Sequence, residues 1–155
     1  MTATAHGEGR VTLTRAFDAP RALVWRAWTD PKSVAQWFGP RGFNSSVPEF
    51  DVRVGGAFRI VMHGPDGNDY PMKGVFLEVV PPERLVYTNI ALDKDGNHLL
   101  EGETTVTFTE QHGKTTLTVV AHAVGRVPIA TQMLAGMEAG WTQTIDKLEE
   151  FVAKG

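Results

Sequence analysis

The last part of the chain carries the strongest periodic pattern of apolar residues. Within residues 128–153, apolar side chains recur every three or four positions, at Ile129, Met133, Met137, Trp141, Ile145, Leu148 and Val152. This spacing is typical of an amphipathic helix that buries one face. Pro128 suits the first turn of such a helix, and Gly155 stands just past its end. The pattern predicts one helix over residues 128–153, about 39 Å long, which would cross the whole molecule.

The first half of this predicted helix differs from its second half. It carries Met133 and Met137 beside Gly136 and Gly140, whereas the second half carries larger side chains. Glycine in a helix interior costs about 1 kcal/mol relative to alanine, and methionine adapts to irregular neighbours. Two interpretations stay open: an empty space beside the methionines, or a bent helix in which methionine fills the gaps.

The rest of the chain shows mostly the two-residue alternation of strands. It predicts an N-terminal strand at 11–17, then a short helix that opens at Pro20 and is capped by Asp18, then a second short helix that starts at Pro31 and is capped by Asp30. Six further strands are expected at 43–54, 57–63, 72–80, 85–92, 99–110 and 115–124. The short turns between them imply antiparallel neighbours.

This order of elements predicts an α+β fold. Seven antiparallel strands can curl, and the C-terminal helix is the element long enough to cover the concave side. In the strand at 72–80 both alternating sets are partly apolar, so the pattern leaves open which face Phe76 and Glu78 occupy. Residues 1–9 are expected to form a disordered tail, and residues 10–155 a single domain.

Composition excludes several classes of function. The 155 residues include no cysteine, which removes disulfides, thiol nucleophiles and cysteine-ligated metals. A net charge of −3 without a cluster of Lys and Arg argues against nucleic acid, and the acidic surface of the terminal helix argues against an anionic membrane. No apolar run reaches the roughly 18 residues of a membrane helix, and no secretion signal opens the chain, so we expect a cytoplasmic protein.

Five short motifs then point to a family. They are VWRAWTDP at 24–31, WFGP at 37–40, GG at 55–56, EVVPPERLVYT at 78–88 and GW at 140–141. Their residues, order and spacing resemble the START-like, or SRPBCC, superfamily, in the bacterial branch related to the C-terminal domain of the ATPase activator of the ninety-kilodalton heat-shock chaperone. The resemblance extends from about residue 10 to residue 153. It implies the helix-grip fold of the birch-pollen allergen, in which a seven-stranded sheet surrounds a long terminal helix with a cavity between them.

The resemblance also implies a range of functions. Members of the superfamily bind lipids, sterols, polyketides and other hydrophobic molecules, and some are cyclases or hydrolases. The fold hosts a site without specifying it. The motifs of this chain are mostly turn formers and core aromatics, so the resemblance transfers no catalytic residue.

We therefore expect an apolar ligand cavity between the sheet and the terminal helix. Its predicted lining is Trp37, Phe38, Phe58, Met62, Phe76, Tyr87, Met133, Met137 and Trp141. Its predicted polar anchors are Arg59, His63, Glu78 and Asn89. Small-molecule pockets usually combine such a lining with a few polar groups. The alternative is that the same aromatic residues form a close-packed core without a void.

Catalytic and metal chemistry find little support in the sequence. His63 and His122 lie in predicted strands without a second ligand at the spacing of a metal site, so we expect no metal and no cofactor. Ser45 and Ser46 have no base near them in sequence and no nucleophile elbow.

Three functions follow from these patterns. The first is non-enzymatic binding of a small hydrophobic or aromatic ligand. The second is a cyclase- or hydrolase-type enzyme that uses Glu78, His63 or Tyr87 as acid or base in the same cavity. The third is a chaperone-associated module that binds a protein partner. It ranks last, because a chaperone activator needs a further partner-binding domain.

Overall fold

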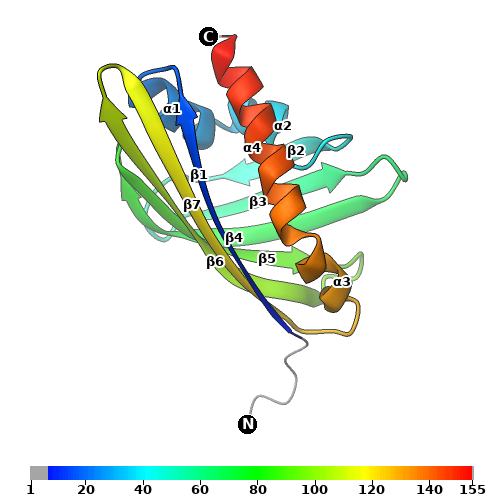
Figure 1. Cartoon of the computed structure of the whole chain (residues 1–155). Helices are drawn as coiled ribbons and strands as arrows, with labels where there is room; N and C mark the ends of the chain where they lie inside the picture. The colour runs from blue at the N-terminus through cyan, green and yellow to red at the C-terminus, as the bar shows by residue number, and fades with distance from the viewer. Residues whose placement is uncertain (1–6, 155) are drawn as a thin grey trace.

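The computed structural model describes residues 7–154, in which seven strands form one curled sheet. In chain order they are β1 (Glu8–Phe17), β2 (Asn44–Phe50), β3 (Ala57–His63), β4 (Asp69–Val80), β5 (Arg84–Leu92), β6 (His98–Gln111) and β7 (Lys114–Gly125). Their order across the sheet is β1-β7-β6-β5-β4-β3-β2, and every neighbouring pair is antiparallel. Figure 1 shows the strands curling around the C-terminal helix, so the predicted α+β helix-grip fold is confirmed.

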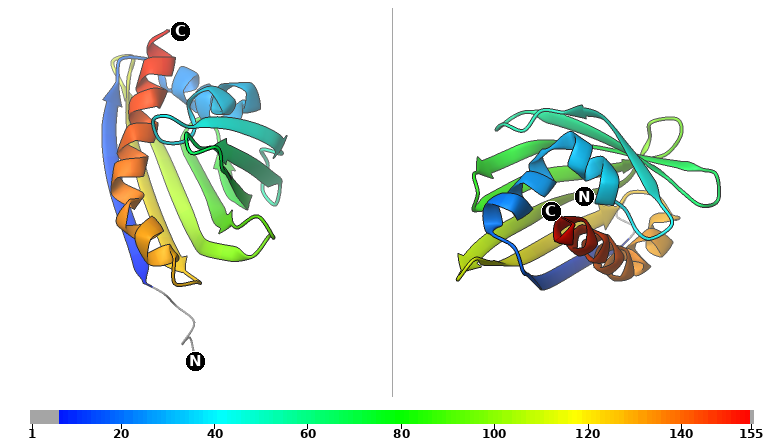
Figure 2. Two further views of the ribbon diagram at one scale, coloured as in Figure 1. Left: turned by 90° about the vertical axis from the view of Figure 1, so that its right-hand side faces the viewer. Right: turned by 90° about the horizontal axis from the view of Figure 1, so that it is seen from above.

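Four helices accompany the sheet. They are α1 (Arg21–Thr29), α2 (Pro31–Trp37), α3 (Ala130–Ala135) and α4 (Met137–Ala153). Helix α4 runs along the concave side of the sheet, and α1 and α2 lie near its C-terminal end (Figure 2). No helix among the described residues is both long and apolar enough to cross a membrane.

The predicted single helix over residues 128–153 is divided at Gly136. This glycine has φ −90° and ψ 0°, and it ends α3 where α4 begins. Its N–H donates to the carbonyl of Gln132 at 3.2 Å, which closes the last turn of α3. Glycine loses the most freedom in a helix and leaves it at the least cost. The apolar period continues across the break because only one residue departs from helical geometry.

The two short helices begin in different ways. Asp30 caps α2 as predicted, since its carboxylate accepts from the backbone N–H of Lys32 at 3.2 Å. The predicted cap by Asp18 is wrong: Pro20 occupies the cap position of α1 and makes no side-chain hydrogen bond to the helix. The backbone N–H of Arg21, the first residue of α1, instead donates to the carboxylate of Glu110 on β6, at 2.7 Å.

Three strands differ by three or more residues at one end from those predicted, and one of them is β4, which begins at Asp69 instead of residue 72. Glu8 and Gly9 pair with Val124 and Ala123 of β7, so β1 begins three residues earlier than expected. Residues 1–6 of the predicted tail lie outside the described residues. The strand predicted at 43–54 ends at Phe50, after a bulge that follows Ser46.

A bulge in β4 decides which face Phe76 and Glu78 occupy. Phe76 pairs with Tyr87, whereas Glu78 pairs with Val86, so one extra residue lies between the two pairs. Phe76 is therefore buried, and Leu77 and Glu78 are both exposed on the outer face. A bulge inverts the alternation on which a prediction of faces depends.

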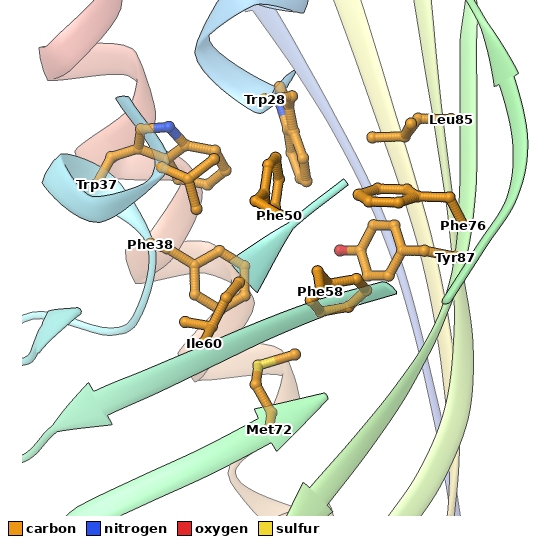
Figure 3. Close-up of a pocket in the computed structure, with 11 residues that line it drawn as sticks. Trp28, Trp37, Phe38, Phe50, Phe58, Ile60, Met72, Phe76, Leu85 and Tyr87 are labelled. Atoms are coloured by element: carbon orange, nitrogen blue, oxygen red, sulfur yellow. The ribbon is translucent and has the colours of Figure 1, made fainter. Parts of the chain in front are cut away.

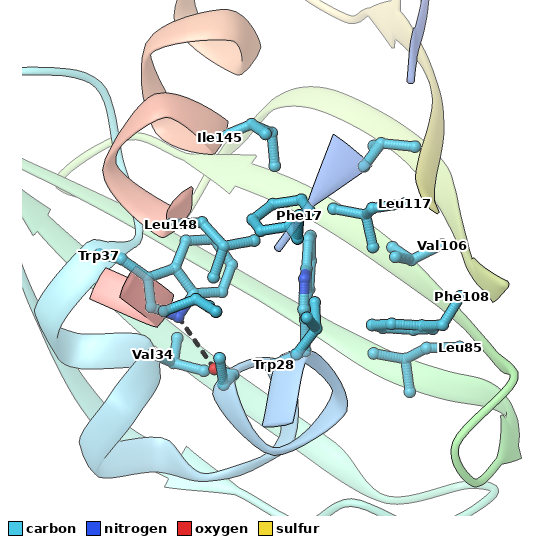
Figure 4. Packing of buried hydrophobic residues seen from close by; sticks show 14 of the residues in the cluster. Phe17, Trp28, Val34, Trp37, Leu85, Val106, Phe108, Leu117, Ile145 and Leu148 are labelled. Carbon is cyan, nitrogen blue, oxygen red and sulfur yellow. Dashed lines mark hydrogen bonds between the residues drawn. The ribbon is translucent and has the colours of Figure 1, made fainter. Parts of the chain in front are cut away.

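The hydrophobic core fills the space between the sheet and the C-terminal half of α4. Ile145 and Leu148 of α4 are completely buried there, together with Trp37 at the end of α2. Trp28 and Trp37 meet edge to face with ring centroids 4.8 Å apart. Trp37 also donates from Nε1 to the carbonyl of Ala27 at 2.9 Å (Figure 4). The core is therefore closely packed at this end of the molecule.

Candidate functional site

A cavity of about 240 Å³ occupies the other end of the space between the sheet and the helices. Its wall is formed by the loop after α2, the inner faces of β3 to β6, α3 and the first half of α4. The residues in the wall are Phe38, Gly39, Pro40, Met62, Tyr70, Pro71, Met72, Tyr87, Asn89, Ala91, Leu92, Leu99, Leu100, Thr104, Met133, Met137, Gly140, Trp141 and Thr144. Most of them are apolar, and none is charged.

The helical wall explains why protein side chains do not fill this space. Gly140 presents no side chain toward Pro40, and a Cβ built on it would lie 3.8 Å from the nearest Pro40 atom. Met133 and Met137 are half-buried and unbranched, unlike the fully buried Ile145 and Leu148 further along. Small and flexible residues therefore line the helix beside the cavity, and bulky residues line it beside the core.

The structure brings six of the nine predicted lining residues to this cavity. They are Phe38, Met62, Tyr87, Met133, Met137 and Trp141. The other three, Trp37, Phe58 and Phe76, lie deeper in the core, where at most 2% of each side chain is exposed. They line a separate space of about 20 Å³, drawn in Figure 3, which has room for about one water molecule.

The structure separates the predicted polar anchors. Asn89 lies in the cavity wall. Arg59 and His63 alternate with the inward Phe58, Ile60 and Met62 on β3, so they face outward. Glu78 also lies on the outer face, where its carboxylate accepts from Nε of Arg84 at 3.1 Å. The predicted role of these three charged or titratable side chains in the cavity is therefore not supported.

His63 has neighbours that the sequence did not reveal. Its Nε2 lies 2.8 Å from Oγ of Ser46, and its Nδ1 lies 2.7 Å from Oδ1 of Asp69. The sequence offers no base close to Ser46 along the chain, and strand pairing supplies one because it brings β2, β3 and β4 together. The order of contacts is that of a serine nucleophile, a base and an orienting carboxylate. However, Ser46 and Asp69 are exposed, and none of the three residues lines the cavity.

One strip of the cavity wall is polar. The hydroxyl of Thr104 on β6 donates to Oδ1 of Asn89 on β5, at 2.8 Å. Tyr87 lies beside them, directly opposite Thr104 in the strand pairing, and its hydroxyl points away from the sheet into the interior (Figure 3). Burial raises the pKa of Tyr87, and a hydrogen bond with Thr104 offsets part of that shift. The phenol therefore stays neutral at physiological pH.

Lys147 holds the loop that closes one side of the cavity. Its Nζ donates to the carbonyls of Gly39, Pro40 and Phe43 at 3.1, 3.4 and 3.1 Å. Burial, and then the charge of Arg41, lower the pKa of this ammonium. Sequence reasoning missed Lys147, because a lysine on a helix normally faces water. Its three acceptors belong to a loop about a hundred residues away.

The described residues hold no cluster of three or more His, Asp or Glu side chains suited to a metal ion. The cavity itself offers amide and hydroxyl groups in an apolar wall. Such a lining recognises a molecule by shape and by a few hydrogen bonds.

Several solved structures of bacterial proteins share this architecture. A protein from Chromobacterium violaceum is 30% identical, with a TM-score of 0.78 over 93% of this chain and 96% of that one. The AHSA1 protein from Silicibacter pomeroyi is 25% identical, with a TM-score of 0.77 over 94% of this chain and 98% of that one. A protein from Arthrobacter aurescens has a TM-score of 0.83 at 24% identity, over 94% of this chain and 87% of that one, which shows the shared fold.

The sequence itself identifies the family. Comparison with curated proteins gives no match. A family model, that of the Activator of Hsp90 ATPase homolog 1-like proteins, matches residues 18–153, which include every element from α1 to α4. This family and its fold are consistent with ligand binding or with chaperone-associated roles. The chain therefore belongs to the family of Activator of Hsp90 ATPase homolog 1-like proteins.

Proposed function

We propose that the protein binds one small hydrophobic or aromatic molecule in the cavity beside Met133 and Met137, without catalysing a reaction on it. The observation that carries this proposal is the apolar cavity of about 240 Å³ at the end of a closely packed core. Protein interiors are normally packed without such voids, so an apolar space of this size is a binding site by default.

Burial of apolar surface supplies the binding free energy. A ligand with one ring and a short substituent covers about 200 Å² of apolar surface, which corresponds to about 5 kcal/mol before the cost of association. Such a ligand binds with a dissociation constant of about 0.2 mM at best. The flexible methionines allow the wall to adapt to its shape.

Filling the cavity tests this proposal. Met137→Trp adds an indole to the cavity wall, whereas Leu77→Trp adds one to the exposed outer face of β4. With isopropylbenzene as the probe, ligand-observed NMR should give saturable binding to the parent and to Leu77→Trp. Binding to Met137→Trp should be at least tenfold weaker. Equal binding by all three proteins would place the ligand elsewhere.

The enzyme alternative is weakened by the positions of its residues. Of its proposed acids and bases, only Tyr87 lines the cavity, while His63 and Glu78 face outward. The Ser46–His63–Asp69 cluster lies on the outer face without an enclosing pocket. Hydrolysis of p-nitrophenyl acetate should therefore be equally slow for the parent and for Ser46→Ala. A loss of rate in Ser46→Ala would establish an esterase activity.

The family name supports the chaperone-associated alternative. Three apolar side chains are exposed on the outer face of β4, those of Val75, Leu77 and Val80. A protein partner could contact them there. If the protein acts through the cavity alone, adding it to a purified bacterial Hsp90 should leave the ATPase rate unchanged. A stimulation that Leu77→Asp abolishes would favour the chaperone role.

A further inference from the structure

The absence of charge from the cavity wall restricts the ligand. None of its lining residues is Asp, Glu, Lys, Arg or His. A carboxylate or an ammonium entering this space would lose its water without meeting an opposite charge, and such transfers are strongly unfavourable. The wall therefore favours neutral molecules.

Three hydroxyl groups in the wall already have acceptors inside the protein. The hydroxyl of Thr144 donates to a carbonyl of its own helix at 2.8 Å. The hydroxyl of Tyr70 donates to the carboxylate of Asp66. The hydroxyl of Thr104 donates to Oδ1 of Asn89. These three hydroxyls are therefore engaged before a ligand enters.

Among the side-chain donors of the wall that donate to no protein acceptor in the described part of the chain, Asn89 offers two N–H groups, whereas Trp141 and Tyr87 offer one each. The bond from Thr104 fixes the orientation of the amide, so its Nδ2 is the atom left without an internal partner. Within residues 7–154 the structure gives Nδ2 no hydrogen bond. The residue opposite Asn89 on β6 is Gly102, which has no side chain to cover the amide. The cavity thus presents two N–H donors in an apolar surround.

Size limits the ligand further. A cavity of about 150 Å³ holds one benzene molecule. The cavity here measures about 240 Å³, which leaves room for one ring and a substituent of a few heavy atoms.

We infer that the ligand is a neutral molecule with one hydrophobic ring and a hydrogen-bond acceptor, such as a ketone, ester or ether oxygen, that accepts from Nδ2 of Asn89. The inference rests on the proposed function and specifies its ligand class. A donor in an apolar wall discriminates between ligands with and without an acceptor, since a ligand without one separates the donor from water and leaves it unsatisfied.

Three probes of one shape test the inference. Acetophenone carries a neutral acceptor, isopropylbenzene replaces the oxygen with a methyl group, and benzoate replaces the methyl ketone with a carboxylate. Because the hydrocarbon leaves water more readily than the ketone, the informative quantity is how a substitution changes the ratio of their dissociation constants. Benzoate should bind the parent about a hundredfold more weakly than acetophenone at neutral pH.

Asn89→Leu removes the donor and keeps the size of the side chain. The dissociation constant for acetophenone should rise roughly fivefold to tenfold, and that for isopropylbenzene should stay level or fall. Equal changes for both probes would overturn the inference and leave the proposed function intact, as would benzoate binding as tightly as acetophenone. If neither neutral probe binds the parent protein, the proposed function itself fails.

A second variant keeps the test decisive if Asn89→Leu does not fold. Asn89→Asp retains the shape and can still accept from Thr104, but it replaces the free donor with an acceptor. Its near-ultraviolet circular dichroism should match the parent. It should lose acetophenone binding by a factor of ten or more, and unchanged acetophenone binding would refute the role of Nδ2.

Discussion

Trp28 and Trp141 stack with their ring centroids 6.4 Å apart and their planes inclined by 19°. Trp28 belongs to the closely packed core, whereas Trp141 belongs to the cavity wall. The pair therefore marks the point along α4 where the core ends and the cavity begins. On the α3 side of Trp141, the helices present smaller or more flexible residues to the cavity.

Replacing Trp141 with alanine should change both the stability of the protein and the size of the cavity. Trp141→Ala removes the stacking partner of Trp28 and should lower the free energy of unfolding by about 2 kcal/mol, less than for a fully buried tryptophan. The enlarged space should also accept a larger hydrocarbon than the parent does. Urea unfolding, followed by circular dichroism, measures the first effect. A loss below about 0.5 kcal/mol would show that the stack carries little stability.

The loop over residues 39–43 should loosen when Lys147 is replaced. Lys147→Met removes a donor from three carbonyls, of which that of Pro40 still accepts from the N–H of Phe43, and we expect a loss of about 1 kcal/mol in stability. Amide hydrogen exchange in residues 39–43 should accelerate, as should the exchange of bound probe. Lys154→Met, an exposed substitution on the same C-terminal segment, is the control. Unchanged exchange in Lys147→Met would mean that other contacts hold the loop.

Glu101 should make stability depend on pH in the acid range. Its carboxylate lies 2.5 Å from Nδ1 of His98 and accepts from Nε of Arg126 at 3.0 Å, and these two partners lower its pKa. A carboxyl group with a lowered folded-state pKa contributes stability above its unfolded-state pKa and loses it as the pH falls through the folded value.

The difference in stability between the parent and Glu101→Gln measures this contribution. It should be present at neutral pH and shrink as the pH falls below about 4, where the carboxyl group of the unfolded chain begins to take up a proton. Glu103→Gln, an exposed change on the same strand, is the control variant. If the difference in stability between the parent and Glu101→Gln stays constant down to pH 3, the ionised carboxylate is not its source.

Two glycine substitutions should have opposite effects. A Cβ at Gly136 meets only ordinary contacts, 3.8 Å from the carbonyls of Gln132 and Met133, and its backbone suits alanine. Gly136→Ala should therefore stabilise the protein by about 0.5 kcal/mol through the unfolded chain. A Cβ at Gly56 would lie 2.0 Å from the carbonyl oxygen of Asp51, so Gly56→Ala should destabilise by about 2 kcal/mol or more. In thermal unfolding, Gly136→Ala should therefore melt above the parent protein and Gly56→Ala below it.

Alternation along the strands predicted much of the cavity wall. Phe58, Ile60 and Met62 alternate with Arg59 and His63 in the sequence of β3, and they share the inner face. The same alternation, continued from Phe108 and Val106, leads to Thr104, and from Leu85 and Tyr87 it leads to Asn89. The polar strip was therefore readable from the pattern, although only Asn89 was selected.

The alternation did not predict whether an inward-facing residue would lie in the core or in the cavity wall. Phe58 and Met62 point to the same side, yet one lies in the core and the other in the cavity wall. That difference depends on the break at Gly136 and on the course of α4, which no local pattern specifies. The bulge beside Glu78 and the cross-strand contacts of His63 depend on register, which is set by long-range pairing.

Methionine methyl NMR tests the central claim most directly. Met62, Met72, Met133 and Met137 all line the cavity, from β3, β4, α3 and α4. In protein labelled with ¹³C at the methionine methyl groups, titration with isopropylbenzene should shift these four signals together and saturably, with one dissociation constant. If the four signals stay fixed while the probe saturates, or if no saturation occurs, the space between the helix and the sheet is not a ligand site.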